Sequence, residues 1–461
     1  MQASDELAAL WLQFPKIDEI GLIDSCDLVE ELGLVAPDTV QYSSKRYVLV
    51  DNKLGVFRST LAQLSSEVSA QRPQILCAHL ENTEKTTRFS NLSRAAILLV
   101  GMSNHTLLNT RKSLLVSHHI DPAGELHLFE VAFSFPHNLK SVEGWAHFHW
   151  LFKHCLEHGC VPRDELLARS LAVCSRAAEL RPRNYYSWTH MTCFVLPALD
   201  LSRCLEEIGR VNRWVSRRPS DHSAQHHLTQ VFQQLSRLSI LPVVAPEQRH
   251  ALARKFCDQI ATITTLSSDI PFPPWSSDAL SAQIITSPGD HLLGALRAAA
   301  FIAPPHIARF PDATAALLSL PSRAFADREA QLLEWFGQAT VSVDGSLTGS
   351  TACGPDSLLG NFAQLCAGEV LFLRHLRGRY PMHISLWNWA TDFWRLLSRW
   401  ISCNTPTSSV FRPVASTSAV PSLASEIHFT TRCIEDALLK ADKTTARGAA
   451  GHARWLLELI R

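Results

Sequence analysis

Apolar side chains recur along most of the chain at positions i, i+3, i+4 and i+7, the spacing of one helix face. This pattern predicts helices of roughly 12–18 residues, each with one side to bury. The clearest β-like run is Tyr47–Val50. Complete apolar stripes occur in two segments: Trp145, Phe148, Leu151, Phe152, Cys155 and Leu156, and Trp387, Ala390, Phe393, Trp394, Leu397 and Ile401. We therefore expect an all-α protein with a minor extended segment near the N-terminus.

Five similar six-residue segments each lie at the start of a predicted helix: Ser103–Leu108, Lys140–Trp145, Arg183–Trp188, Ser220–Gln225 and Met382–Trp387. The second, third and fifth of them have tryptophan as their last residue. Helix breakers precede most of them: Gly101, Pro182, Pro219 and Pro381. The steps between the second, third and fourth segments are 43 and 37 residues, which suits one helix pair per repeat. The sequence therefore predicts an α-α superhelix, a solenoid of antiparallel helix hairpins.

The three tryptophans at the common offset, Trp145, Trp188 and Trp387, are predicted to be structural residues buried between helices. Ser141, Asn184 and Asp221 are placed to cap the helices that follow them. Three nearby histidines are expected to form hydrogen bonds between helices: His147, His149 and His190.

Changes in composition divide the chain into four predicted regions. Segments 264–290, 340–357 and 403–424 are rich in Ser, Thr, Pro or Gly and offer little apolar surface to bury. Residues 1–88 are predicted to be a helical N-terminal segment with the stretches IDEIGLI and NKLGV, and residues 89–241 to be the helical repeats. Residues 242–357 are predicted to be an irregular middle, and residues 358–461 a C-terminal repeat with further helices.

Charge and cysteine content argue against a nucleic-acid-binding protein and against a secreted one. The 461 residues hold 43 Lys and Arg against 43 Asp and Glu, which argues against nucleic acid as the main partner. The longest apolar run, near Ala95–Met102, is too short to span a bilayer. The 12 cysteines are scattered and no secretory signal is recognisable, so we expect a cytoplasmic protein in a reducing compartment.

A metal site is the least favoured interpretation of the histidine-rich stretch 154–160. His154 and His158 share a helix face, but Cys155 and Cys160 do not complete a second ligand pair. No phosphate-binding loop, nucleophile elbow or metalloprotease motif occurs in its required context. We therefore expect no metal in this chain, and a self-sufficient enzyme is disfavoured.

The segment Pro182–His190 has the pattern Pro-basic-Asn-Tyr-x-x-Trp-x-His. It resembles the repeat of protein prenyltransferase α subunits, which runs approximately P-K-N-Y-x-x-W-x-H-R. Lys16–Ile23 and Val48–Val56 look like stretches found at the start of one branch of that family, the α subunit repeat-containing proteins. The similarity covers roughly residues 14–236 and 363–400.

Several repeat positions depart from the family pattern. The family arginine that follows the tryptophan survives only as Arg111, and other residues replace it elsewhere: Phe148, Met191 and Ala390. Gln225 stands where the fourth segment should have tryptophan.

The resemblance implies a helical α subunit that is inactive alone and works in a heterodimer with a prenyltransferase β subunit. That β subunit would hold zinc and the isoprenoid diphosphate, so no cofactor is expected in this chain. The expected reaction is geranylgeranyl transfer to a protein substrate with a C-terminal cysteine. The alternative is a non-catalytic helical-repeat scaffold for protein–protein interaction.

Lys140 and Tyr185 match the family lysine and tyrosine that lie near the diphosphate, so the resemblance makes them candidate catalytic residues. An ammonium group there would stabilise charge on the leaving oxygen. Arg183 and His137 are candidate substrate-binding residues on the same face. The competing interpretations are a solvated surface lysine and a tyrosine that packs between repeats.

Overall fold

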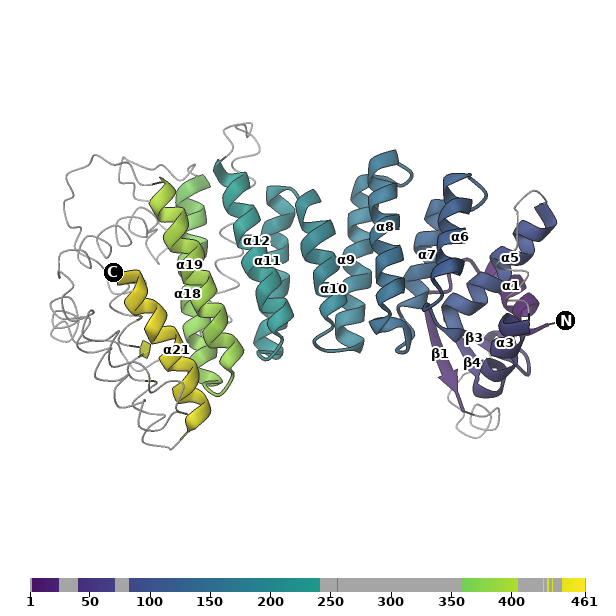
Figure 1. Cartoon of the computed structure of the whole chain (residues 1–461), viewed down its shortest axis with the longest axis horizontal. Coiled ribbons are helices and arrows are strands. Elements are labelled where there is room, and N and C mark those ends of the chain that lie inside the picture. Colours follow the sequence, from purple (N-terminus) through teal and green to yellow (C-terminus); the bar gives the residue numbers. More distant parts are fainter. Residues whose placement is uncertain are drawn as a thin grey trace. The chain divides into compact units, whose positions relative to one another are not determined.

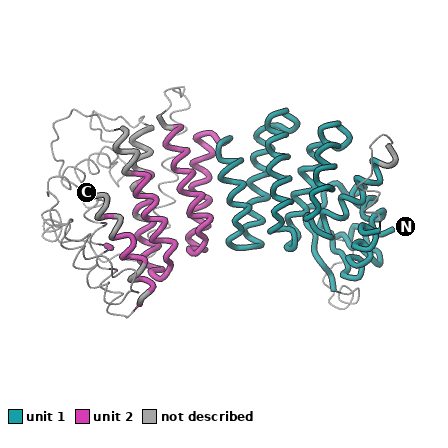
Figure 2. The backbone as a smooth tube through the Cα atoms, in the orientation of Figure 1, with its two compact units in different colours: residues 1–198 teal, residues 199–461 magenta. Residues whose placement is uncertain are grey.

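The computed structural model describes residues 2–24, 40–70, 83–240, 255, 358–404, 426, 429, 430, 433 and 442–460. The predicted irregular middle, 242–357, therefore lies outside the described residues apart from Lys255, as does most of segment 403–424. The chain divides into two compact units, 1–198 and 199–461 (Figure 2). The four regional boundaries expected from composition stay predictions.

Most described residues are helical, which confirms the main prediction of the apolar pattern. In unit 1 the elements are α1 (Ala3–Gln13), β1 (Glu19–Ile23), β2 (Val40–Ser43), β3 (Tyr47–Val50), β4 (Lys53–Phe57), α3 (Arg58–Ala70), α5 (Thr83–Ala95), η2 (Ala96–Val100), α6 (His105–Val116), α7 (Pro122–Ala132), η3 (Asn138–Lys140), α8 (Val142–His158), α9 (Arg163–Leu180), α10 (Tyr185–His190), η4 (Met191–Val195) and η5 (Leu196–Ala198). In unit 2 they are α11 (Leu201–Arg217), α12 (His222–Ile240), α18 (Leu358–Arg379), α19 (Ile384–Asn404) and α21 (Lys443–Ile460).

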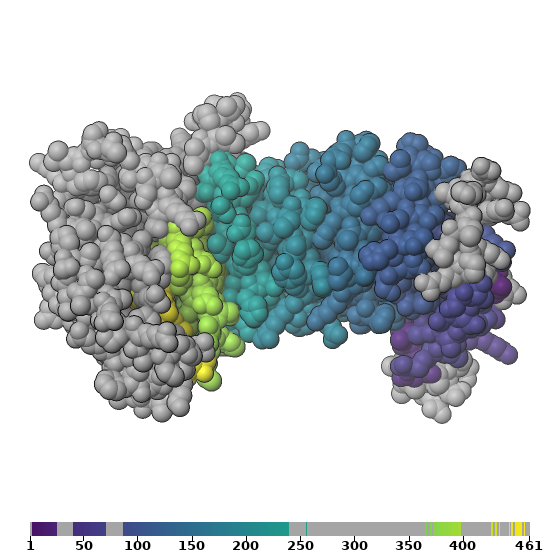
Figure 3. All heavy atoms as spheres, viewed as in Figure 1, coloured from purple at the N-terminus to yellow at the C-terminus, as the bar shows by residue number. Residues whose placement is uncertain are grey.

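Within each unit, successive helices lie side by side as hairpins (Figure 1). We number the repeats by their helices: the first is α5 and η2 with α6, the second α7 with α8, the third α9 with α10, the fourth α11 with α12, and the last α18 with α19. The space-filling view shows side chains closing the spaces between the ribbons of α6 to α10 on the visible face (Figure 3). The predicted superhelix over the whole chain stays a prediction.

The N-terminal region, which we expected to be helical, also contains a four-stranded sheet with strand order β1-β4-β3-β2. The predicted strand at Tyr47–Val50 is confirmed as β3. The IDEIGLI and NKLGV stretches are strands too, because β1 and β4 pair in parallel over Glu19–Ile23 and Lys53–Phe57. A Cβ at Gly55 would lie 2.7 Å from Val48 Cγ1, so glycine is required at this close approach.

The sheet is bound to the repeats by three polar contacts within unit 1. The Ser134 hydroxyl, just after α7, accepts a hydrogen bond from the Ile20 amide at 2.9 Å. Arg176 of α9 pairs with the Glu19 carboxylate at 2.9 Å and donates to the Asp18 carbonyl at 2.8 Å. The stretch that resembles the family start therefore fastens the sheet to the second and third repeats.

Proline ends the first helix of three hairpins, as the sequence predicted. Helices α9, α11 and α18 each stop two residues before a proline, at Leu180, Arg217 and Arg379. The second helices then begin at capping residues: the Ser141 hydroxyl accepts from the Gly144 amide at 3.0 Å, and Asp221 accepts from the Ala224 amide at 3.3 Å.

The repeat tryptophans are buried, which agrees with the structural role predicted for them. Trp145 donates from its indole nitrogen to the Leu139 carbonyl at 3.0 Å, and Trp387 donates to the Pro381 carbonyl at 3.0 Å. Each acceptor lies six residues before its tryptophan. Gln225 donates from its side-chain amide to the Pro219 carbonyl, again six residues earlier. The substitution in the fourth repeat therefore loses the ring and keeps the hydrogen bond.

Buried charge clusters occur inside the hairpins. Glu125 of the second repeat binds Arg111 of α6, in the first repeat, and accepts from His147 of α8 at 3.1 Å, with all three side chains buried. Burial alone would raise the pKa of Glu125, but the Arg111 charge and the bonds from His147 and Arg111 lower it to about 2. The fourth repeat has a related cluster, in which Glu207 pairs with the partly exposed Arg210 of its own helix and with the buried His227 of α12. The hydrogen bond predicted for His147 is thus confirmed.

The third repeat lacks the glutamate. Ser170 stands 18 residues before Trp188, as Glu207 stands before Gln225. Neither ring nitrogen of His190 has a hydrogen-bond partner among the described residues, so the bond predicted for it is wrong. Burial holds the pKa of His190 well below its usual value, and the ring packs as a neutral group against His149, whose Nε2 also lacks a described partner.

The last repeat keeps the glutamate and lacks the histidine. Glu369 lies 18 residues before Trp387, and Trp389 occupies the position of the histidine. One Glu369 oxygen accepts from Asn212 at 2.8 Å, and the other has no partner among the described residues. Burial raises the pKa of Glu369 to about 8, against the smaller opposing effect of the Asn212 bond.

Glu125→Ala is expected to lower the free energy of unfolding by about 3–5 kcal/mol, because Arg111 would be left buried without its counter-charge. Chemical denaturation of the purified chain measures the change. Glu143→Ala, at a more exposed carboxylate whose His105 partner is largely exposed, is the control and should cost less than 1 kcal/mol. An equal effect of the two substitutions would contradict the proposed role of the cluster.

Glu369 is expected to make stability depend on pH. Because its pKa is about 8 in the fold and near 4.5 when unfolded, the folded chain holds the extra proton between these values. Its stabilising contribution is therefore complete below pH 4.5 and lost as the pH rises through 8. Glu369→Gln should flatten this decline in urea titrations at several pH values, whereas Glu179→Gln, at an exposed site, should leave it unchanged.

Candidate functional site

The candidate residues lie on the turns that join the two helices of the second and third repeats. Lys140 is the last residue of η3, directly before the α8 cap Ser141. Tyr185 is the first residue of α10, and 65% of its surface is exposed. Arg183 and His137 are exposed on the same two turns. All four predicted residues therefore reach solvent at turns of unit 1.

One buried carbonyl connects the two turns. The Leu139 oxygen accepts hydrogen bonds from the Trp145 indole and from the Asn184 side-chain amide, both at 3.0 Å. Leu139 directly precedes Lys140, and Asn184 directly precedes Tyr185. The structure therefore brings the two candidate catalytic residues onto adjoining turns, which are linked by the hydrogen bond from the Asn184 side chain to the Leu139 backbone carbonyl.

Asn184 has a different role from the one predicted. It occupies the cap position of α10, but its side chain makes no capping hydrogen bond. Its amide is fully buried and points across the repeat junction to Leu139. The sequence pattern identified the position, whereas the direction of the side chain depends on how the third repeat packs against the second.

The Lys140 turn is also held to the first repeat. The Asn138 amide donates to the Ile97 carbonyl at 3.0 Å and to the Ala132 carbonyl at 3.1 Å. His137, one residue earlier, faces Gly101, because a Cβ at that glycine would lie 3.6 Å from His137 Nε2. The turn is thus supported from both sides while its lysine remains exposed.

Lys140 and Tyr185 are available to a bound molecule. Among the described residues, the Lys140 ammonium makes no ion pair or hydrogen bond, and Tyr185 makes only a ring contact with Tyr186. Arg183 adds positive charge from a left-handed backbone conformation with φ of 59°, which is uncommon for a residue with a side chain. The two turns together thus carry an ammonium, a guanidinium and a phenol hydroxyl.

The same junction recurs in unit 2 without this chemistry. The Pro219 carbonyl accepts from Gln225 and, at 3.4 Å, from the Ser385 hydroxyl of the last repeat. At the positions of Lys140 and Tyr185, this junction has Ser220 of the fourth repeat and Ile384 of the last repeat. Of the two junctions, only the one in unit 1 thus combines the backbone link with exposed lysine and tyrosine side chains.

The histidine-rich end of α8 does not bring its histidines and cysteines together as four ligands. The rings of His154 and His158 lie with their centres 4.3 Å apart near the surface, whereas Cys155 is buried. Burial raises the pKa of the Cys155 thiol to about 12, which disfavours the thiolate that zinc requires. In the described part of the chain, no three His, Cys, Asp or Glu side chains are grouped to hold a metal ion.

None of the described helices is both long enough and apolar enough to cross a bilayer.

Sequence comparison supports the resemblance carried by the repeats. A human protein named protein prenyltransferase alpha subunit repeat-containing protein 1 is 26% identical over 242 residues, which is 48% of this chain and 58% of the relative. The chain is a homologue of these α subunit repeat-containing proteins. A Xenopus laevis relative, named protein prenyltransferase alpha subunit repeat-containing protein 1-A, is 25% identical over 297 residues, or 58% of this chain and 66% of its own length.

The matches cover less than two-thirds of these relatives' own lengths. A zebrafish (Danio rerio) relative of the same name as the human protein is 27% identical over 232 residues, covering 45% of this chain and 52% of its own length. No known family model matches the chain. The homology therefore supports the prenyltransferase α-subunit repeat as the type of repeat present.

Sequence reasoning did not find two features that support the site. The Leu139–Asn184 bond joins residues 45 positions apart, and the only signal for it is the asparagine that precedes the repeat tyrosine. The buried Glu125–His147 pair was also missed, although a histidine two residues after the repeat tryptophan marks one half of it. In both cases the partner comes from another helix or turn, where spacing along the chain gives no constraint.

Asn184→Ala is expected to lower the free energy of unfolding by about 1 kcal/mol, because it removes a buried hydrogen bond while Leu139 keeps the one from Trp145. It should also speed amide hydrogen exchange in residues 138–141, which the bond holds in place. Asn109→Ala, at an exposed position of α6, is the matched control. Unchanged exchange in the Lys140 turn would show that the bond does not position it.

Proposed function

We propose that this chain acts as the α subunit of a heterodimeric protein prenyltransferase and supports a separate catalytic β subunit. The proposed reaction is geranylgeranyl transfer to the C-terminal cysteine of a protein substrate. The observation that carries the proposal is the hydrogen bond between Leu139 and Asn184, which holds the exposed Lys140 and Tyr185 on adjoining turns. The homology to α subunit repeat-containing proteins supports the same assignment.

In such a reaction the cysteine sulfur forms a bond to the isoprenoid carbon while the bond from that carbon to the diphosphate oxygen breaks. Negative charge grows on the departing oxygen, and positively charged or hydrogen-bonding groups fixed nearby lower the barrier. Lys140 would supply an ammonium and Tyr185 a hydroxyl donor. Arg183 and His137 would hold the diphosphate on the same edge.

The partner would complete the site. Zinc, which activates a cysteine thiol by favouring its thiolate, is assigned to the β subunit, as is the pocket for the isoprenoid chain. This chain would then provide one edge of the active site and be inactive alone. Its contribution depends on the rigidity of the Lys140 and Tyr185 turns, because a misplaced charge stabilises the transition state poorly.

A second candidate function is a helical-repeat scaffold that binds partners without taking part in transfer. The positions of the family arginine favour it, since Phe148, Met191 and Ala390 are fully buried apolar residues in this chain. The family's charged positions are therefore retained only in part, and Arg111 serves a buried ion pair rather than a ligand.

Lys140→Ala should reduce geranylgeranyl transfer on the order of 10²-fold in a complex of this chain with a prenyltransferase β subunit, because one donor to the leaving group is lost. Co-expression, purification of the complex and single-turnover transfer to a cysteine-containing substrate measure it. Lys153→Ala, at an exposed lysine in the middle of α8, is the matched control and should retain wild-type turnover. Tyr185→Phe, which removes only the hydroxyl, should give a smaller loss.

Two outcomes would contradict the enzymatic assignment in different ways. A stable complex with no transfer by the wild-type chain would favour the scaffold. Transfer that is unchanged by both Lys140→Ala and Tyr185→Phe would leave the heterodimer in place and remove these residues from the catalytic site.

A further inference from the structure

The C-terminal end of α8 folds the chain back on itself. Gly159 adopts a left-handed conformation with φ of 63°, which glycine tolerates best. The Gly159 amide donates a hydrogen bond to the Cys155 carbonyl, and the Cys160 amide donates to the same carbonyl at 3.3 Å. This is the Schellman ending of a helix, in which the residue after the glycine returns to contact the residue five positions earlier.

A contact between two apolar side chains frequently accompanies this ending, but here both residues are cysteines. Cys155 is fully buried and Cys160 is exposed. The hydrogen bond from the Cys160 amide to the Cys155 carbonyl, at 3.3 Å, holds the two residues together across the turn, and a disulfide requires such a short separation.

We propose that Cys155 and Cys160 form a reversible disulfide, which makes the end of α8 a site of oxidative modification. The oxidant is a peroxide. The exposed Cys160 thiolate attacks one peroxide oxygen, gives a sulfenic acid and releases water. The Cys155 sulfur then attacks the Cys160 sulfur, the S–O bond breaks, and the oxygen leaves as a second water. Two thiols are oxidised and one peroxide is reduced to two waters.

The assignment of roles follows from exposure. Cys160 meets solvent, so peroxide reaches it first. Burial, with a smaller effect of Cys160, raises the pKa of the Cys155 thiol to about 12, so Cys155 is a poor first nucleophile. It enters only the second step, where its place beside Cys160 in the same turn gives it a high local concentration that offsets its raised pKa.

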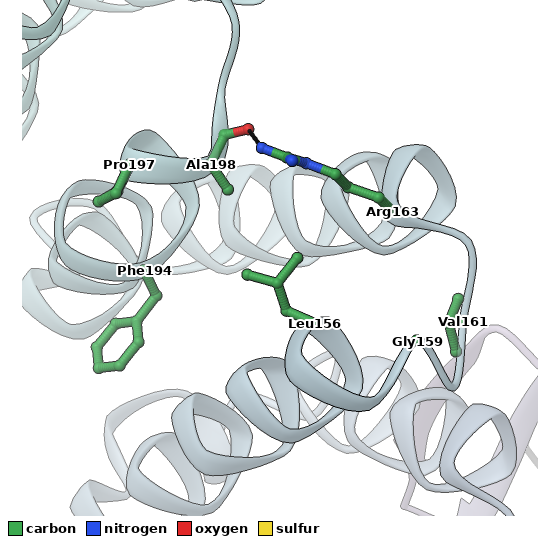
Figure 4. Close-up of a pocket in the computed structure, with 7 residues that line it drawn as sticks. All are labelled: Leu156, Gly159, Val161, Arg163, Phe194, Pro197 and Ala198. Carbon is green, nitrogen blue, oxygen red and sulfur yellow. Dashed lines mark hydrogen bonds between the residues drawn. The ribbon is translucent and has the colours of Figure 1, made fainter.

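The disulfide would fix one wall of a cleft. Leu156, Gly159 and Val161 line a cleft of about 370 Å³ together with residues of η4 and η5 (Figure 4). Leu156 points toward the opposite wall, where the Arg163 guanidinium donates to the Ala198 carbonyl at 2.7 Å. A covalent link across the turn would restrict the motion of this wall and leave the Arg163 contact in place.

The test treats the purified full-length chain with increasing hydrogen peroxide, blocks the remaining thiols by alkylation, and digests it with trypsin. Cleavage after Lys153 and Arg163 releases residues 154–163 with both cysteines in one peptide. We expect this peptide to lose two hydrogen atoms, to resist alkylation and to regain both thiols with dithiothreitol. Amide exchange in the turn should slow after oxidation.

Cys160→Ser should abolish the internal disulfide, and since residue 160 is exposed the variant should fold normally. Cys193→Ser, at an exposed cysteine of η4, is the matched control and should leave the disulfide unchanged. Recovery of Cys160 as sulfinic acid, or in a bond to another molecule, with Cys155 still a free thiol would overturn the proposal. The test needs no β subunit, so its result is independent of the proposed transfer activity.

Discussion

The second and third repeats depend on one backbone carbonyl at their junction. The Leu139 oxygen accepts from the indole of its own repeat and from Asn184 of the next. A turn buried between helices leaves carbonyls that water cannot reach, and an unpaired one is costly. The tryptophan of the repeat therefore both fills the apolar interior and donates a hydrogen bond. Lys140 is positioned because the preceding residue, Leu139, accepts these two hydrogen bonds.

The hydrogen bond and the aromatic ring are separable parts of the repeat tryptophan. Gln225 keeps the donor without the ring, and its acceptor, Pro219, also receives a bond from the following repeat. The buried glutamate and histidine behave in the same way, because His190 and Glu369 each survive without the usual partner. A buried histidine without the glutamate stays neutral, whereas a buried glutamate without the histidine binds a proton. The loss of the histidine from the last repeat therefore makes the stability of the chain depend on pH.

The two ends of α8 have different chemistry. Its N-terminal end carries Lys140 on a turn supported by hydrogen bonds to both neighbouring repeats. Its C-terminal end carries Cys155 and Cys160 on a turn next to an open cleft. The first is suited to positioning a fixed charge, and the second to a modification that alters local mobility.

The sequence by itself determined the helical hairpins, the proline stops and the burial of the repeat tryptophans, because these features depend on spacing within a single helix or turn. Through its resemblance to the family repeat, it also named Lys140 and Tyr185 as candidates, which stay predictions. It did not show that the N-terminal motif stretches form a sheet, that Asn184 turns from its cap to Leu139, or that His190 lacks a partner. Only the tertiary structure decided these, because each depends on atoms supplied by a strand, helix or turn distant in sequence.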